Sequence, residues 1–270
     1  MLLRRQLLVL TGLTGTLPVR GDKAPTRPVR VERLYQTPGP KPNGLQATKD
    51  GLWILDQGDN RAYLVDYSTG KPLRILDTES KAGSGITFDG EALWLASTYS
   101  CEIIRADARS GKTLAKYPSP GAGPVHWTEG RKSPLAPAAP PSPAPSPRGK
   151  PAASRPATGA HGLEWRQGKL YIANPPSRRI YRMEPNAWKI EFEFPTAGNR
   201  PHGLGWEGKW LWCVDSNDNA FYKHDPETGQ IHEKIQLADS DPLPHGMTIW
   251  NGWLWYCDDV GLMCRFRLRA

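Results

Sequence analysis

The sequence lacks several features that would point to familiar classes of protein. It has four cysteines in 270 residues, which fit neither a disulfide-rich scaffold nor a zinc knuckle. The apolar stretch within the first thirteen residues is too short to span a bilayer, and no other apolar run is long enough. There is no Ser/His/Asp triad order, phosphate-binding loop or nucleotide fingerprint. These absences exclude a disulfide-stapled mini-protein, a helical membrane protein and the common nucleotide-dependent enzymes.

The net charge of +8 is not organised as a nucleic-acid interface. A proline-rich segment holds five basic residues against one acid, Glu129: Arg131, Lys132, Arg148, Lys150 and Arg155. Elsewhere the basic residues are mixed with acids, and no basic stripe alternates with aromatic residues. We therefore expect no nucleic-acid partner.

The sequence does contain an internal repeat. A glycine followed by an aliphatic residue recurs in one setting, at Asn43-Gly44-Leu45, Ser84-Gly85-Ile86, His161-Gly162-Leu163, His202-Gly203-Leu204 and His245-Gly246-Met247. We call the first residue of each motif position zero. Three intervals between these glycines are 41, 41 and 43 residues, and the fourth, from Gly85 to Gly162, is 77. A period near 40 with β character is typical of a propeller.

Each repeat is predicted to form one blade of four antiparallel strands. A glycine turn such as Asp50-Gly51 separates the first two strands, and the second carries an aromatic residue at position ten: Trp53, Trp94, Tyr171, Trp212 and Trp255. A polar loop, a third alternating strand and a second glycine turn such as Ser68-Thr69-Gly70 lead to the fourth strand. We predict an all-β fold, a single β-propeller in which most tryptophans pack between blades.

Closure of the ring can also be predicted. Five blades are visible, and a sixth would have to lie between Gly85 and Gly162. The last repeat stops at Ala270 with three strands, whereas the alternating segment Arg30–Tyr35 has no blade of its own. We expect that segment to become the outer strand of the final blade, within a propeller domain of residues 29–270.

Two segments are expected to lie outside the blades. Residues 128–158 form a Pro/Ala-rich insert that we predict to be disordered, since proline cannot donate the hydrogen bonds of a strand. Residues 1–22 include Arg4-Arg5-Gln6-Leu7-Leu8, which looks like a twin-arginine signal. We expect export to the periplasm or the extracellular space; the alternative is a disordered tail on a cytoplasmic protein.

Cys257 and Cys264 are equidistant from Val260-Gly261. A hairpin that turned there would place them opposite one another, which permits a cross-strand disulfide in an exported protein. Bridges between directly paired strands are often strained, so two buried free thiols are the favoured alternative.

Position zero is expected to lie beside position thirteen at the mouth of the central channel, because the hairpin between the first two strands turns midway. The five pairs are Asn43/Asp56, Ser84/Ser97, His161/Asn174, His202/Asp215 and His245/Asp258. Three of them carry a histidine, and all three lie in the last three repeats.

Four interpretations of these pairs remain open. His161, His202 and His245 with Asp215 and Asp258 are candidate ligands of a divalent metal such as magnesium, zinc or iron. His202 or His245 is a candidate general base, with Glu164, the one acid at position three, as a further catalytic candidate. The rim of a ligand site would add Asn43, Asp56, Ser84, Ser97 and Asn174. The alternative is structural: these side chains would bond a tight corner, with Asp capping the next loop.

The segment Pro201–Trp206 followed by Leu211–Asp215, and the same pattern from Pro244 to Asp258, resembles repeats of the streptogramin (virginiamycin B) lyase family. The resemblance covers about residues 43–117 and 160–268 and extends more loosely to NHL-type propellers. That family is a seven-bladed propeller that binds magnesium and opens a cyclic depsipeptide by elimination with a His base. The resemblance implies His161, His202 or His245 as the base and Glu164 as an aid to the metal.

The segment Ser84–Trp94 and the blade count also resemble glutaminyl cyclotransferase propellers. Those enzymes cyclise N-terminal glutamine through a glutamate and an aromatic pocket. From the residues and both resemblances we expect an exported monomer that binds a small molecule, a peptide or a metal at the channel mouth. The alternative function is a lyase-like or cyclase-like enzyme that uses the same rim.

Overall fold

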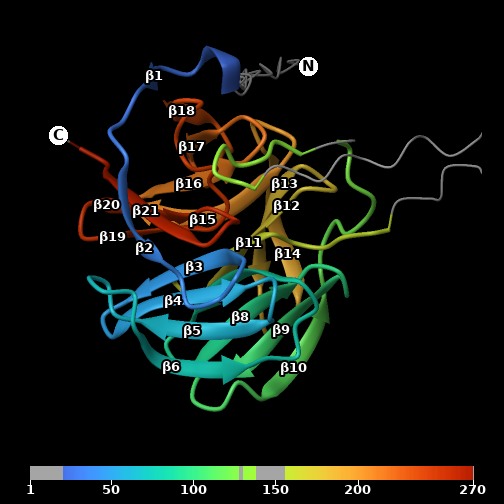
Figure 1. Ribbon diagram of the computed structural model, residues 1–270. Helices are drawn as coiled ribbons and strands as arrows, with labels where there is room; N and C mark the ends of the chain where they lie inside the picture. Colours follow the sequence, from blue (N-terminus) through green and yellow to red (C-terminus); the bar gives the residue numbers. More distant parts are fainter. Residues whose placement is uncertain (1–20, 128–129, 138–155, 270) are drawn as a thin grey trace, which may run out of the picture.

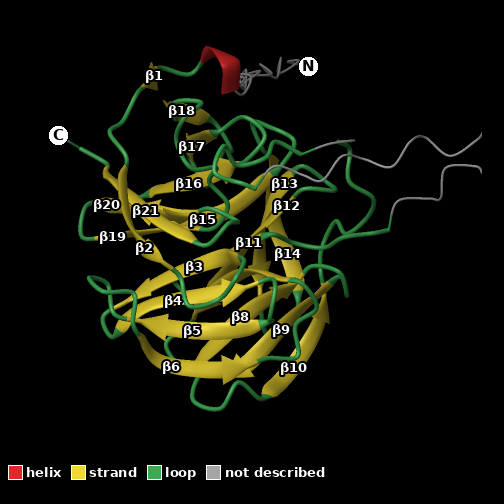
Figure 2. Ribbon diagram, in the orientation of Figure 1, coloured by secondary structure: helices red, strands yellow, loops and turns green. Residues whose placement is uncertain are grey.

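The protein is a five-bladed β-propeller. The computed structural model describes residues 21–127, 130–137 and 156–269 (Figure 1). Apart from one short 3-10 helix, η1 (Gly21–Lys23), the described residues form strands and the loops that join them (Figure 2). The predicted all-β fold is confirmed. The export signal expected in residues 1–22 lies almost wholly outside the described residues. Within the described part of the chain, no helix has the length and hydropathy required to cross a membrane.

The blades follow one another along the chain, with the first strand of each innermost. Blade 1 contains β3 (Pro42–Thr48), β4 (Gly51–Asp56), β5 (Arg61–Val65) and β6 (Pro72–Asp77). Blade 2 contains β7 (Gly83–Phe88), β8 (Ala92–Ser97), β9 (Glu102–Asp107) and β10 (Thr113–Pro118). Blade 3 contains β11 (Gly162–Arg166), β12 (Lys169–Asn174), β13 (Arg179–Glu184) and β14 (Lys189–Pro195).

The last two blades each include a strand from the start of the described chain. Blade 4 contains β15 (Pro201–Glu207), β16 (Trp210–Asp215), β17 (Ala220–His224) and β18 (Ile231–Gln236), with β1 (Thr26–Arg27) parallel to β18. Blade 5 contains β19 (Met247–Trp250), β20 (Trp253–Cys257) and β21 (Leu262–Arg267), and β2 (Glu32–Gln36) is its outer strand, antiparallel to β21. The predicted closure by an N-terminal strand is therefore confirmed, and no sixth blade occurs in the described residues.

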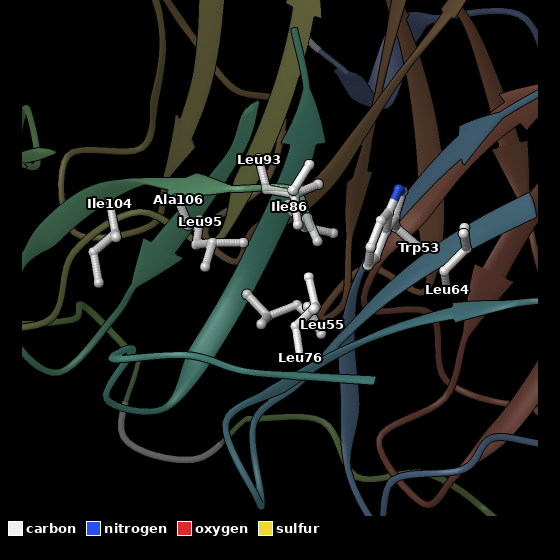
Figure 3. Packing of buried hydrophobic residues seen from close by; sticks show 11 residues of the cluster. Trp53, Leu55, Leu64, Leu76, Ile86, Leu93, Leu95, Ile104 and Ala106 are labelled. Carbon is white, nitrogen blue, oxygen red and sulfur yellow. The ribbon is translucent and has the colours of Figure 1, made fainter. Parts of the chain in front are cut away.

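The hydrophobic core lies between neighbouring blades. Figure 3 shows the interface of blades 1 and 2, where side chains of both sheets interdigitate: Trp53, Leu55, Leu64, Leu76, Ile86, Leu93, Leu95, Ile104 and Ala106. Alternate residues of β4 pack against the two neighbouring blades: Leu55 packs toward blade 2 and Ile54 toward blade 5. The aromatic residue at position ten is buried between blades in every repeat, as predicted.

The repeated glycine is required by close packing around the axis. A Cβ on Gly44 would lie 1.9 Å from the carbonyl oxygen of Ser84, and one on Gly162 would lie 1.9 Å from that of His202. The equivalent positions in the other three blades also face a backbone atom of the next inner strand, at 2.1 to 2.7 Å. Real Cβ contacts are not this short, so only glycine fits.

The turn of blade 5 differs by one residue from the prediction. Cys257 lies opposite Met263, and Cys264 lies opposite Tyr256. The Asp258 N–H donates to Leu262 O at 2.9 Å, which centres the turn on Val260. The two cysteines therefore pack into different clusters on opposite faces of the sheet, and both are free thiols.

The insert leaves and re-enters the propeller at the channel mouth. Gly123 and Thr158 form an antiparallel bridge at its base, with N···O distances of 3.0 and 2.8 Å. Within the described residues 130–137, Arg131 NH2 lies 2.7 Å from Asp239, and Ser133 Oγ donates to Asp258 Oδ2 at 2.6 Å. The predicted disorder of the insert falls mainly on 138–155, which lie outside the described residues; residues 130–137 contact the propeller.

Candidate functional site

A pocket opens where the five inner strands begin, at the end of the propeller that we call the mouth. Its volume is about 240 Å³. Four of the five position-zero residues line it, together with residues from the neighbouring loops and the two ends of the insert: Lys41, Asn43, Gln57, Tyr99, Val125, Trp127, Thr158, His161, Arg200, His202, His245 and Asp259. The predicted gathering of position zero on one face is what the structure shows.

The position-zero side chains contact one another around the axis. Ser84 Oγ lies 2.7 Å from Asn43 Oδ1 and 3.0 Å from the carbonyl oxygen of His161. His161 Nδ1 lies 3.0 Å from His202 Nε2, and the two rings meet edge to face. The rings of His202 and His245 also meet edge to face, with 4.8 Å between their centroids. The three imidazoles thus form one contiguous cluster.

The hydrogen bonds determine the tautomers of two of these rings. Because Ser216 Oγ donates its proton to Pro244 O, it can only accept from His202 Nδ1, which lies 3.1 Å away. The carbonyl oxygen of Arg200, 3.0 Å from the same nitrogen, can also only accept. His202 Nδ1 therefore carries the proton, and its Nε2 accepts from His161 Nδ1. His161 Nε2 is left as a buried acceptor with no partner among the described residues. A buried acceptor without a partner lowers the free energy of unfolding, because its hydrogen bond to water is lost and not replaced.

Burial keeps all three imidazoles neutral. It lowers the pKa of His161 to about 3, with a further contribution from the positive charge of Arg200. It lowers the pKa of His202 well below its usual value. It also lowers the pKa of His245 to about 4, although the carboxylate of Asp259, 3.8 Å from His245 Nε2, acts in the opposite direction.

The carboxylates at position thirteen point away from the histidines. Asp215 Oδ2 accepts from the backbone N–H of Arg200 at 2.7 Å, and Oδ1 accepts from those of Asn217 and Asp218. Asp56 and Asp258 make the same pattern of bonds in blades 1 and 5. These residues hold the start of the inner strand against the loop that follows the second strand. The structural alternative for the aspartates therefore describes what they do in this fold.

The partner of position thirteen is also displaced by one residue. Asp215 pairs with Pro201, Asp56 with Pro42 and Ser97 with Gly83, each one residue before position zero. An irregularity in the ladder follows in all three blades. Asn174 donates to Pro120 O at 2.8 Å and thereby anchors the start of the insert. The predicted pairs are neighbours in the sheet, but their side chains do not form His/Asp dyads.

Glu164 lies in a second polar layer beneath the pocket. Its carboxyl group accepts from the N–H of Trp165 at 3.0 Å and bonds Thr87, whose hydroxyl lies 2.5 Å from Gln46 Oε1. Burial raises the pKa of Glu164 to about 8, so this carboxyl group is protonated at neutral pH. It does not line the pocket.

The five predicted metal ligands are not arranged around a common divalent metal position. In residues 21–127, 130–137 and 156–269, no group of three or more His, Cys, Asp or Glu side chains is arranged to hold an ion. His202 uses both ring nitrogens in hydrogen bonds, and the oxygens of Asp215 and Asp258 accept from backbone N–H groups. Magnesium, which prefers several oxygen ligands, would find none of these free.

Arg200 is the main feature that the sequence argument missed. Its guanidinium lines the pocket, lies 5.8 Å from the ring of Trp127 and has NH2 3.3 Å from His245 Nε2. NH1 donates to Arg131 O, whereas Nε is buried without a partner. No carboxylate among the described residues forms an ion pair with Arg200, and the charges of Asp259 and Asp215 act on it only from farther away. Burial accordingly lowers the pKa of this guanidinium.

The repeat itself holds the signal that would have found Arg200. Arg200 and Lys41 both occupy the position two residues before position zero, and Asp259 occupies position fourteen. Aligning the flanks of the motif as well as its centre would have placed these three charges at the mouth. Trp127, Val125 and Thr158 come from the non-repetitive connection between β10 and β11, which includes the insert, so no comparison between blades could have indicated them.

Comparison with known proteins supports the fold. No family model matches the chain, and no curated protein matches it. Among solved structures, a glutaminyl cyclase from Myxococcus xanthus is similar with a TM-score of 0.65 and 9% identity, over 91% of this chain and 98% of that one. A streptogramin B lyase has a TM-score of 0.49 at 15% identity, over 89% of this chain and 98% of that one.

A virginiamycin B lyase from Staphylococcus aureus has a TM-score of 0.47 at 20% identity, over 84% of this chain and 66% of that one. The similar structures thus include both families that the motifs resemble. At these identities the likeness establishes a β-propeller and nothing finer.

Proposed function

We propose that the mouth pocket binds a small molecule that carries a carboxylate or phosphate group. The observation that carries this proposal is Arg200, a cation in the pocket wall that has no carboxylate partner among the described residues. A buried charge is normally paired, and an arginine fork is suited to bidentate binding of a carboxylate or phosphate. A bound anion would supply the missing partner.

The charges around the pocket support an anionic ligand. Lys41 and Arg200 contribute two positive charges and Asp259 one negative charge, while the three imidazoles are neutral. The site therefore has a net charge of about +1. Asp56 and Asp215 do not line the pocket, and their oxygens accept from backbone N–H groups, although the charge of Asp215 also acts on Arg200.

The remaining lining specifies two further properties of the ligand. His161 Nε2 is a buried acceptor, so a ligand with a hydroxyl or N–H donor on that side would satisfy it. Tyr99, Val125 and Trp127 supply apolar and aromatic surface on the insert side. We expect a small organic anion with one donor group and an apolar part. As part of the same proposal, the Arg4-Arg5 order supports an exported protein.

Binding of small anions tests the proposal directly. Benzoate and phenyl phosphate are suitable first probes, measured by calorimetry and by the shift in melting temperature. At a free probe concentration of about a hundred times Kd, binding should raise the free energy of unfolding by about 2.7 kcal/mol. Arg200→Gln should weaken binding at least tenfold, whereas Arg166→Gln at the opposite end should leave it unchanged. The proposal would be overturned if the protein bound neither probe, or if Arg200→Gln bound them as tightly as the native protein.

Catalysis by the same rim is the second candidate function. The full-length likeness to a glutaminyl cyclase supports a test for cyclisation, and the chain of His161, His202 and the Arg200 carbonyl has the form of an oriented base. The pKa values argue against it: a general base works best with a pKa near the operating pH, and that of His161 is about 3. We therefore favour binding without turnover.

Mass spectrometry can separate the two functions. Peptides with N-terminal glutamine, incubated with the protein, would lose ammonia if it is a cyclase. An activity that His161→Asn abolishes while the melting temperature is kept would establish catalysis at this site. Unchanged peptides together with anion binding would support the binding function.

A further inference from the structure

A second groove lies between blades 2 and 3, far from the mouth along the repeat. It is at the end of the propeller where the first strand of each blade turns into the second, which we call the turn end. Its volume is about 370 Å³, and it is lined by side chains from the turns of both blades: Asp89, Glu91, Trp94, Arg105, Tyr117, Trp165, Gly168, Pro185 and Asn186. Neither the repeat nor the proposed anion site accounts for it.

Nearly parallel aromatic rings form the apolar part of this groove. Trp94 lies 5.9 Å from Trp165 and 5.7 Å from Tyr117, with interplanar angles of 16° and 27°. Trp188 stacks on Tyr117 at 4.2 Å and on Trp94 at 6.2 Å. Trp94 is buried, whereas the other three rings are partly exposed. The rings form one stacked aromatic cluster, in which Tyr117 and Trp165 supply partly exposed apolar surface to the groove.

The turn that carries Trp188 departs from the repeat at an energetic cost. Four residues after the acid that begins this turn, blades 1, 2 and 4 have Gly70, Gly111 and Gly229, each with φ between 69° and 75°. Blade 3 has Trp188 there, with φ 49°. A bulky side chain is strained in this left-handed region, whereas glycine adopts it freely. Stacking on Tyr117 and a bond from Trp188 Nε1 to Pro118 O at 3.0 Å offset that cost.

The rim of the groove is polar and slightly acidic. Asp89 Oδ2 accepts from Trp94 Nε1 at 2.8 Å and lies 3.6 Å from Arg105, which also lies 3.7 Å from Glu91. Asn186 adds an amide on the opposite side. Two carboxylates against one guanidinium make the groove unfavourable for phosphate groups. A neutral ligand with many hydroxyl groups can both donate to the carboxylates and accept from Arg105 and Asn186.

The corresponding groove between blades 3 and 4 shows what is particular to this one. Trp206 occupies the same repeat position as Trp165, but the guanidinium of Arg166 covers its ring at 4.3 Å. Tyr171 meets Trp206 edge to face, so these two rings do not stack. In the groove between blades 2 and 3, Arg105 lies 5.9 Å from the ring of Trp94, but no cation in the described part of the chain lies over the ring of Trp165.

We propose that the groove between blades 2 and 3 binds a neutral saccharide built from glucose-type pyranose units. A pyranose ring with equatorial hydroxyls presents only C–H groups on its two faces, and these stack on aromatic rings. Its hydroxyls then lie in the plane of the ring, where the rim supplies both acceptors and donors. The partly exposed rings of Tyr117 and Trp165 can stack on the C–H face of such a sugar, and the acidic rim can bind its hydroxyl groups.

Calorimetry with cellohexaose tests the proposal on the whole protein. We expect binding to the native protein that Trp165→Ala weakens at least tenfold and that Trp165→Tyr partly restores. Trp206→Ala is the matched control, since it removes the same residue from the groove that Arg166 covers, and it should bind like the native protein. Circular dichroism and melting temperature identify any variant that fails to fold.

Three outcomes would overturn the proposal. They are no binding of cellohexaose by the native protein, equal weakening by the Trp165 and Trp206 variants, and binding of decaproline in place of cellohexaose. The last would mark the groove as a site for proline-rich peptides. Retention of sugar binding by Trp165→Tyr together with loss by Trp165→Ala would show that the ring face itself is needed.

Discussion

The mouth and the turn end are built from the same repeat, yet they are constrained differently. At the mouth, each blade brings a glycine against the backbone of the next blade and seals polar side chains in one buried network. At the turn end, glycines serve hairpin turns in solvent, and a Cβ on Gly168 or Gly208 would meet nothing within 4 Å. The mouth tolerates little change, whereas the turn end has room for blades to diverge, as Trp188 and Arg166 do.

Alanine in place of Gly162 should break this contrast most strongly. Its Cβ would lie 1.9 Å from the carbonyl oxygen of His202, which two packed backbones cannot relieve, so we expect a loss of roughly 3 kcal/mol in the free energy of unfolding. Gly168→Ala should cost only about 1 kcal/mol, from its φ of 75° alone. Urea denaturation compares the two. Equal losses would mean that the mouth is no more tightly packed than the turns.

Removal of a capping aspartate should give the next largest difference. Asp215 is buried and accepts from three backbone N–H groups at the mouth, so Asp215→Ala leaves these donors unpaired at a cost of about 2 kcal/mol. Asp225 is half-buried, and the bonds that it accepts from the N–H groups of Glu227 and Thr228 at the turn end are exposed, so water can replace it in Asp225→Ala at a cost of about 1 kcal/mol or less. Midpoints of chemical unfolding would reveal the difference, and a larger loss for Asp225→Ala would contradict it.

The pH dependence of stability should give the smallest effect per site. Burial lowers the pKa of His161, His202 and His245 at the mouth and of His224 at the turn end, the last to about 4. The unfolded chain then binds more protons below pH ~6.5, so stability is fully present above that pH and is lost as the pH falls, by up to about 1.4 kcal/mol per unit for each imidazole.

Four buried carboxyl groups act in the opposite direction. Burial raises the pKa of Glu164 to about 8, those of Asp215 and Asp258 to about 6, and that of Asp56 above its usual value, so the folded state binds more protons at these sites, which favours folding as the pH falls. The four imidazoles all contribute below pH ~6.5, whereas Asp215 and Asp258 contribute mainly below pH ~6, so we expect a net loss of melting temperature from pH 7 to 5. His161→Gln and His224→Gln should each flatten the profile. A melting temperature independent of pH would show that the imidazoles are not held neutral.

The fold could be predicted because its determinants repeat. The spacing of the repeated glycines, the aromatic residue at position ten and the unpaired segment Arg30–Tyr35 were enough to predict five blades and the closure, whereas a sixth blade between Gly85 and Gly162 stayed open. Register at the single-residue level could not be predicted. The ladder irregularity beside position zero and the centre of the turn at Val260 depend on backbone hydrogen bonds that side-chain patterns do not encode.

The candidate site could be predicted only in part. The histidines were placed at the mouth, but their predicted carboxylate partners bind backbone N–H groups instead. Arg200 could not be predicted from the motif alone, because it lies two residues before position zero. Trp127 could not be predicted because the connection between β10 and β11 has no counterpart in the other blades. Repetition reveals where a site lies, whereas the residues that give it specificity are those that do not repeat.

The narrow axis has a consequence for exchange of a bound molecule. Inner strands of blades that are not neighbours, β3 and β15 among them, come within 8 Å of one another, and Thr87 and Glu164 fill the space beneath the mouth. Trp127 and Thr158, which lie on the connection between β10 and β11, border the pocket on the solvent side of these strands. A substitution that narrows the opening at either residue would slow arrival and departure by the same factor, which lengthens the residence time and leaves affinity unchanged.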